Sequence, residues 1–153
     1  MKDPTFVEFR PDNLSPVLLY MARIGESHKG WINFEPAIHV EDTPPEKSTL
    51  FGTLFTARGP EVPLATWTPG DGRKTGSGRA TIGILHASGP KAHKRVDVPA
   101  GWVRMQDHAK KGLVLAVPTD VSNKDTLKWL LGATETLSVV PLTGEWRAAV
   151  YEP

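Results

Sequence analysis

The segment from Ser122 to Ser138 constrains the fold most, because two independent signals predict a helix there. Ser122 and Asp125 have the spacing of a capping box, in which the first side chain accepts a backbone N–H of the opening turn. At about 100° per residue, one stripe of this helix collects apolar and small side chains: Leu127, Leu130, Leu131, Thr134, Leu137 and Ser138. The pattern predicts an amphipathic helix that packs through one face.

Strand-like segments lie on both sides of that helix. Four segments are apolar or alternate in polarity and predict strands: ATIGILH (80–86), WVRMQDH (102–108), LVLAVP (113–118) and EWRAAVY (145–151). Residues 89–96, with Pro90 at the start, predict two turns of helix. The order strand, helix, strand, strand, helix, strand is that of a split βαβ, or ferredoxin-like, arrangement.

The alternation in residues 102–108 predicts which side chains share a face of that strand. Successive strand residues point to opposite faces. Arg104 is therefore expected on one side with Gln106 and His108, and Asp107 on the other.

The N-terminal part predicts a helix and a strand. Ser15 is suited to the helix N-cap, Pro16 to the first helical position and Gly25 to the helix end, with an apolar segment between them. Residues 30–40 read as extended, and Pro36 indicates an edge or a bulge there.

Residues 49–57 (TLFGTLFTA) and 64–68 (LATWT) predict a hairpin joined by the turn at 58–63. With the elements above, they predict an α+β fold with a mostly antiparallel sheet. We expect a single domain over residues 1–153, in which 1–78 form an N-terminal helix and hairpin extension and 79–153 the ferredoxin-like (βαββαβ) portion. A chain of 153 residues is long enough for one domain with a core.

Composition excludes several classes of protein. Hydrophobic residues make up 39% and charged residues 23%, which is typical of a globular chain and not of a disordered one. The absence of cysteine excludes a disulfide framework and thiolate metal sites. The first residues lack the apolar core of a signal peptide, and no apolar run approaches the roughly 18 residues of a membrane helix. We therefore expect a cytoplasmic protein that does not insert into membranes.

Charge is unevenly distributed although the net charge is only +1. Residues 58–111 contain ten Lys and Arg against four Asp and Glu, whereas the segments on either side are net acidic. This basic central block predicts contact with an anionic partner. The alternative is that these cations solvate turns, because a block in the sequence need not form a patch in space.

Two parts of the block are candidates for anion binding. The glycine-rich stretch TPGDGRKTGSGRAT (68–81) lacks the spacing of a phosphate-binding P-loop or dinucleotide fingerprint, so it predicts a hairpin loop, either without a ligand or contacting an anion. The segment 89–95 predicts a helix N-terminus facing a strand end, which suits an anion. The candidate anion- or nucleic-acid-binding residues are Arg73, Lys74, Arg79, Lys91, Lys94 and Arg95.

Histidines provide a catalytic alternative. The five histidines match no metal-ligand spacing, so we expect no metal site and no cofactor. His86 and His108 end predicted strands, and Asp107 precedes His108. If those ends meet near His93, the four side chains form an acid/base cluster, because imidazole titrates near neutral pH.

Trp129 faces away from the leucine stripe of its helix. Gly132 and Ala133 lie beside it and would allow close approach of a second chain. These three residues predict an interface through which the protein forms a homodimer.

The sequence favours a non-enzymatic binding or regulatory module that contacts an anionic partner, nucleic acid or another phosphate-containing ligand, through its basic central segment. One alternative is a protein-interaction role of the inhibitor or immunity type, with acidic residues 41–46 and exposed aromatic side chains as the contact. Another is a small enzyme that uses the histidine cluster. Whether the protein is an enzyme stays open at this point.

Overall fold

The computed structural model describes residues 2–42, 59–71 and 78–153. Within these residues the chain forms an antiparallel sheet with the strand order β1-β7-β2-β3-β4-β6-β5. The strands are β1 (Thr5–Phe9), β2 (Trp31–Ile38), β3 (Leu64–Thr68), β4 (Thr81–Leu85), β5 (Val103–His108), β6 (Gly112–Ala116) and β7 (Leu142–Tyr151). With two α-helices beside this seven-stranded sheet, the predicted α+β class is confirmed.

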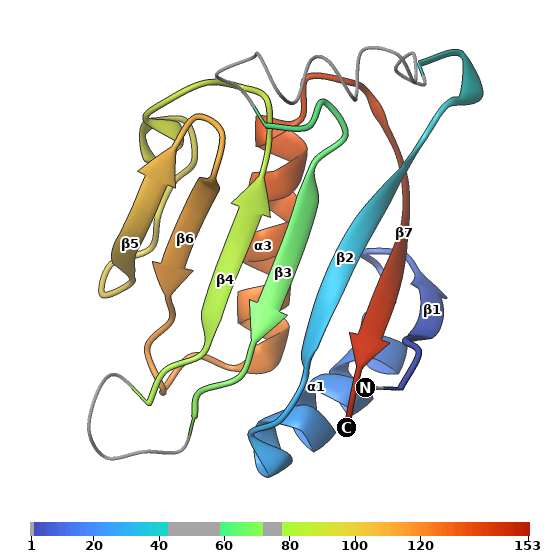
Figure 1. Ribbon diagram of the computed structural model, residues 1–153, viewed down its shortest axis with the longest axis vertical. Coiled ribbons are helices and arrows are strands. Elements are labelled where there is room, and N and C mark those ends of the chain that lie inside the picture. Colours follow the sequence, from blue (N-terminus) through green and yellow to red (C-terminus); the bar gives the residue numbers. More distant parts are fainter. Residues whose placement is uncertain (1, 43–58, 72–77) are drawn as a thin grey trace.

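Both helices, α1 (Ser15–Ser27) and α3 (Asn123–Leu137), lie against the same face of the sheet, behind it in the view of Figure 1. The strands alternate accordingly. In β2, Ile32 and Phe34 are buried beneath the helices, while Asn33 between them is only half-buried. The core therefore forms between one face of the sheet and the two helices, as expected when each element is apolar on one side.

The predicted C-terminal helix is confirmed as α3. The side chain of Ser122 accepts a hydrogen bond from the backbone N–H of Asp125 at 3.1 Å, which is the predicted cap. The predicted stripe is buried in the core through Leu127, Leu130, Leu131, Thr134 and Leu137.

The N-terminal helix is confirmed as α1, but both of its predicted ends are wrong. Leu14 is the N-cap residue and Ser15 is already helical. The helix continues through Gly25 to Ser27. Its C-cap residue, His28, adopts a left-handed conformation with φ 59° and donates its backbone N–H to the carbonyl of Ile24 at 2.8 Å. Histidine is one of the few residues besides glycine that is enriched in this conformation, so glycine is not needed to end the helix.

Two strand predictions are confirmed. Pro36 lies in β2 at a register shift against β7, which is the predicted bulge. β3 and β4 pair antiparallel, so the glycine-rich stretch connects a hairpin. β3 pairs with β2 on one side and with β4 on the other, so the predicted hairpin of residues 64–68 with residues 49–57 is wrong. Residues 49–57 and 72–77 themselves lie outside the described part of the chain.

The strand order does not confirm the predicted ferredoxin-like portion. Strands β4, β6 and β5 are neighbours in the order of that arrangement, but β2 and β3 lie between β4 and the closing strand β7. The predicted helix at 89–96 is also wrong, because only a single 3-10 turn, η2 (Ala92–Lys94), forms there. Pairing of β7 with β1 and β2 places the closing strand among N-terminal elements that lie far away in the sequence.

Neither described helix has the length and apolar character needed to cross a membrane.

Candidate functional site

A bulge in β5 organises the candidate site at that edge of the sheet. Arg104 pairs with Leu115 of β6, but Gln106 pairs with Val114, so the register shifts between them. Paired residues in a ladder share a face, and Asp107 pairs with Leu113, which like Leu115 is buried beneath the helices. The bulge therefore brings Arg104 to the same face as Asp107, and the predicted strict alternation is wrong.

Asp107 anchors the segment that carries η2 to β5. Its carboxylate accepts the backbone N–H groups of Ala92 and His93, each at 3.0 Å, and a hydrogen bond from Nδ1 of the His93 ring. Burial by itself would raise the pKa of Asp107, since its side chain is only 8% exposed, but these hydrogen bonds and the nearby His93 ring outweigh burial and hold the pKa below its ordinary value. Asp107 is therefore a carboxylate whose acceptor positions are used within its own chain.

His93 links this carboxylate to Arg104. Because Nδ1 of His93 donates to Asp107, its Nε2 carries the lone pair, and the guanidinium of Arg104 donates to it. The result is a hydrogen-bonded triad of side chains, Arg104–His93–Asp107, that runs from solvent to the interior. Arg104 is exposed, the His93 side chain is 27% exposed and Asp107 is nearly buried.

A pocket of about 410 Å³ lies beside these three side chains. Its lining consists of Pro90, Lys91, His93, Arg104, Met105, Gln106 and Asp107. Lys91 has φ 59°, a left-handed backbone conformation. This conformation is unfavourable in free energy for residues other than glycine. The structure therefore holds a lysine in an unfavourable backbone conformation at the pocket.

Cations outnumber carboxylates around this pocket. Between residues 87 and 111 the sequence has six Lys and Arg and two aspartates, one of which is the internally bonded Asp107. Asp107 lies near the end of β5, where the turn to β6 begins, so η2 and that turn occupy the same end of the strand. We name as the β5-edge surface five exposed cations from these two segments and from β5 itself: Lys91, Lys94, Arg104, Lys110 and Lys111.

Arg95, another predicted binding residue, is engaged within its own loop. Its guanidinium donates to the carbonyl of Pro90 at 2.9 Å, and to the carbonyl of Gly89 and the hydroxyl of Ser88 at 3.0 Å each. These bonds hold the turn that precedes η2. Arg95 therefore shapes the loop of the β5-edge surface and adds charge beside it.

Arg79, another predicted cation, does not join this surface. Arg79 precedes β4 at the opposite end of the strand from the η2 segment, and it lies 3.5 Å from the carbonyl of Gly101. Arg73 and Lys74 lie outside the described residues. Of the acidic segment 41–46, the structure describes only Glu41 and Asp42, in the 3-10 turn η1 (Val40–Asp42).

The predicted histidine cluster is brought together only in part. His93 and Asp107 are in contact, but His108 turns its Nδ1 toward the backbone N–H groups of Lys110 and Lys111 and caps its own turn. His86 is fully buried. Its Nδ1 accepts from the backbone N–H and the hydroxyl of Ser88, at 3.2 and 3.0 Å, so the proton of the neutral ring is on Nε2.

His86 stays uncharged for electrostatic reasons. Burial lowers its pKa most, and the positive charge of Arg95 lowers it further, while Asp107 opposes the shift. Within the described part of the chain its Nε2 has no hydrogen-bond partner. An imidazolium in this position would be a buried charge with one donor unsatisfied.

Trp129 has partners in its own chain. Its indole Nε1 donates to the carbonyl of Asp97 at 2.9 Å, and its ring packs on Trp102 with centroids 5.0 Å apart. Ala133 is buried in the core and Gly132 is exposed. The outward direction of Trp129, which suggested the homodimer, thus has an explanation within the monomer, and the homodimer stays a prediction.

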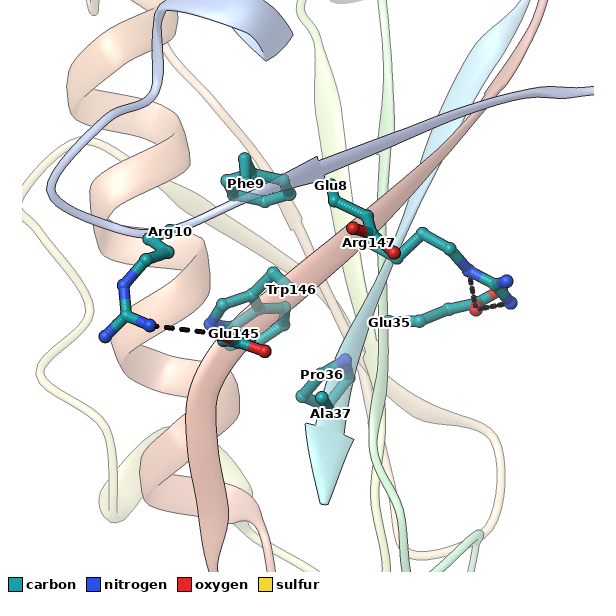
Figure 2. Close-up of a pocket in the computed structure, with 9 residues that line it drawn as sticks. All are labelled: Glu8, Phe9, Arg10, Glu35, Pro36, Ala37, Glu145, Trp146 and Arg147. Carbon is teal, nitrogen blue, oxygen red and sulfur yellow. Dashed lines mark hydrogen bonds and ion pairs between the residues drawn. The ribbon is translucent and has the colours of Figure 1, made fainter. Parts of the chain in front are cut away.

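A second pocket, of about 490 Å³, lies near the other edge of the sheet (Figure 2). Strands β1, β7 and β2 place Glu8, Arg147 and Glu35 next to one another in register. Arg147 pairs with Glu35 at 2.6 Å and its guanidinium stacks over the ring of Phe6, while Arg10 pairs with Glu145 at 3.2 Å. Both arginines that line this pocket are therefore paired with a glutamate.

Sequence reasoning named Lys91, His93 and Asp107 but missed Arg104 as their partner. The only sequence signal for Arg104 is its position in an alternating strand, and that signal places it on the wrong face. A bulge depends on pairing with β6, so it leaves no local pattern.

The described residues contain no group of three or more side chains that could hold a metal ion. In comparisons with known proteins, no protein-family model, no curated protein and no solved structure matches this chain. A function for this protein is therefore inferred from the geometry and charge of the site.

Proposed function

We propose that this protein is a non-enzymatic binding module that contacts a phosphate-bearing partner, nucleic acid in the first place, through the β5-edge surface. The observation that carries the proposal is the excess of exposed cations on β5 and on the two segments at its C-terminal end, where Asp107 is hydrogen-bonded internally and does not neutralise them by direct contact. Lysine and arginine side chains that neutralise phosphates release counterions, and this release is the main source of affinity for a nucleic-acid backbone.

The histidine geometry favours binding over acid/base catalysis. A general base needs a lone pair within reach of a substrate proton. The exposed nitrogen of His93 accepts from Arg104, and the ring of His86 is buried with its free nitrogen protonated. Neither ring presents a basic nitrogen to solvent in this arrangement.

The test is a titration with a fluorescently labelled oligonucleotide, single-stranded and double-stranded, at several salt concentrations. We expect affinity to fall with salt, with a slope of about 0.7 to 0.9 in log Kd per log unit of salt for each phosphate neutralised. The double variant Lys91→Gln/Arg104→Gln should weaken binding and lower that slope by about 1.4 to 1.8, the contribution of two phosphate contacts.

The matched control is Lys2→Gln/Lys29→Gln, which removes the same charge from exposed positions beside β1 and α1. We expect this variant to lose less affinity than the β5-edge variant and to keep the wild-type slope. Equal losses in both variants would show that only net charge matters, and no binding at low salt would refute the proposed function.

A further inference from the structure

The pocket beside β5 presents donors to an incoming anion. Lys91, Arg104 and His93 all line it. Lys91 and Arg104 can donate hydrogen bonds as they are, and His93 can donate through Nε2 once that nitrogen carries a proton. The one carboxylate in the lining, Asp107, already accepts from two backbone N–H groups and the His93 ring. A volume of about 410 Å³ is ample for one phosphate group.

The charge of this pocket depends on His93. Lys91 and Arg104 contribute two positive charges and Asp107 one negative charge, so the net charge is +1 with a neutral ring and +2 with a protonated one. An internal phosphodiester carries a single negative charge, whereas a phosphate monoester approaches two above its second pKa of about 6. A doubly charged terminal phosphate thus matches the pocket best when His93 takes up a proton.

The contact between Arg104 and His93 provides a route for this proton uptake. Phosphate oxygens are stronger acceptors for a guanidinium than a neutral imidazole nitrogen is, because the hydrogen bond is then charge-assisted on both sides. When Arg104 moves to a bound phosphate, Nε2 of His93 becomes free to bind a proton and to donate to the same phosphate. Asp107 at Nδ1 stabilises the imidazolium that forms.

Charged groups face His93 from β5 and from its own segment. Arg104 and Asp107 face it from β5, and Lys91 and Lys94 lie on either side of it in its own segment. The two lysines and Arg104 oppose protonation of the ring, and Asp107 favours it. A bound phosphate adds negative charge and tips this balance toward the protonated ring.

We propose that the pocket formed by Lys91, His93 and Arg104 binds a phosphate monoester, such as the 5′-terminal phosphate of a nucleic-acid strand, and that binding is coupled to protonation of His93. This inference rests on the proposed function and adds to it the chemical group that the pocket recognises.

The test compares two oligonucleotides of one sequence, with a 5′-phosphate or a 5′-hydroxyl, at pH 6.5 and pH 8.5. We expect the 5′-phosphate to improve affinity about tenfold at pH 6.5, the worth of one additional charge-assisted hydrogen bond, and about threefold at pH 8.5. The terminal phosphate is mostly doubly charged throughout this range, so the change with pH reports on the protein.

The variant His93→Asn distinguishes the effect of ring protonation from the structural effect of the hydrogen bond to Asp107. Its side-chain amide can keep the donor to Asp107, but it has no nitrogen that gains a proton in this range. We expect it to bind both oligonucleotides, with a 5′-phosphate advantage that no longer changes between pH 6.5 and pH 8.5. A pH dependence that persists in His93→Asn would overturn the assignment of the proton to His93.

Inorganic phosphate alone, followed through the ring resonances of His93, identifies the source of the ligand. If inorganic phosphate binds as tightly as the oligonucleotide and the ring becomes protonated on binding, the ligand is free phosphate. If it binds more weakly, the ligand is a strand end. Both results support a phosphate site. Equal affinity of the two oligonucleotides at both pH values overturns the inference and leaves the proposed function standing. No binding of either oligonucleotide overturns the proposed function itself.

Discussion

The two edges of the sheet use the same kinds of charged side chain in different ways. Near β1, Arg10 and Arg147 face glutamates on adjacent strands and form ion pairs with them (Figure 2). At β5, Arg104 contacts a neutral histidine, and the nearby carboxylate of Asp107 is bonded to backbone N–H groups. The comparison shows that ion pairing, more than the number of cations, decides at which edge of the sheet positive charge is available to an external partner.

Removal of the Asp107 charge should have the largest effect. The change Asp107→Asn replaces a carboxylate that accepts three hydrogen bonds by an amide with one acceptor oxygen, so at least one nearly buried donor loses its partner. We expect the free energy of unfolding to fall by about 2 to 3 kcal/mol in chemical denaturation. A loss below about 0.5 kcal/mol would mean that Asp107 does not anchor the η2 segment.

Acidification should destabilise the β5 side in two steps. His86 has a pKa lowered by burial, so the unfolded chain binds a proton as pH falls below 6.5 while the folded protein does not, and the free energy of unfolding decreases in that range. Asp107 has a lowered pKa as well, so its contribution is present above pH 3.8 and is lost as pH falls below that value.

Denaturation curves between pH 7.5 and pH 5 measure the first of these steps. The variant His86→Asn keeps an acceptor for the backbone N–H of Ser88 but has no side chain that titrates there, so its stability should depend less on pH than that of the wild type. An unchanged pH dependence in this variant would show that His86 is not the group responsible.

A smaller effect on stability is expected at Lys91, where the substitution should raise the free energy of unfolding instead of lowering it. The change Lys91→Gly relieves the left-handed backbone at φ 59°, and we expect a gain of about 1 kcal/mol in the free energy of unfolding, reduced in part by the larger entropy of an unfolded chain with glycine. The same variant should bind the oligonucleotide more weakly. A protein both less stable and equally active in binding would assign Lys91 a structural role.

The smallest effect is expected at the β1 edge. Glu35→Gln removes the partner of Arg147 in an exposed ion pair, and such pairs contribute about 0.2 to 1 kcal/mol. This change also leaves Arg147 without its closest carboxylate, so it should slightly strengthen the binding of an oligonucleotide at low salt. A loss of stability as large as that of Asp107→Asn would break the distinction between the two edges.

Parts of the candidate site followed from the sequence. The sequence predicts that Lys91 and Lys94 contact anions, and this stays a prediction; the structure shows that both are exposed in the segment of η2. His93 and Asp107 were expected to meet if two strand ends were adjacent, and they do meet. His86 and His108 do not contact this pair, because each ring is hydrogen-bonded to residues two or three positions further along the chain.

The sequence alone determined the elements that depend on local chemistry. The cap at Ser122 and the leucine stripe of α3 involve residues within a few turns of one helix, so their pattern is visible in the chain and the structure confirms it. Only the tertiary structure decided the position of β7 between β1 and β2, and the bulge that turns Arg104 toward His93. Both depend on pairing between residues that are distant in the sequence, and a shift of one residue in such a pairing moves a side chain to the other face of the sheet.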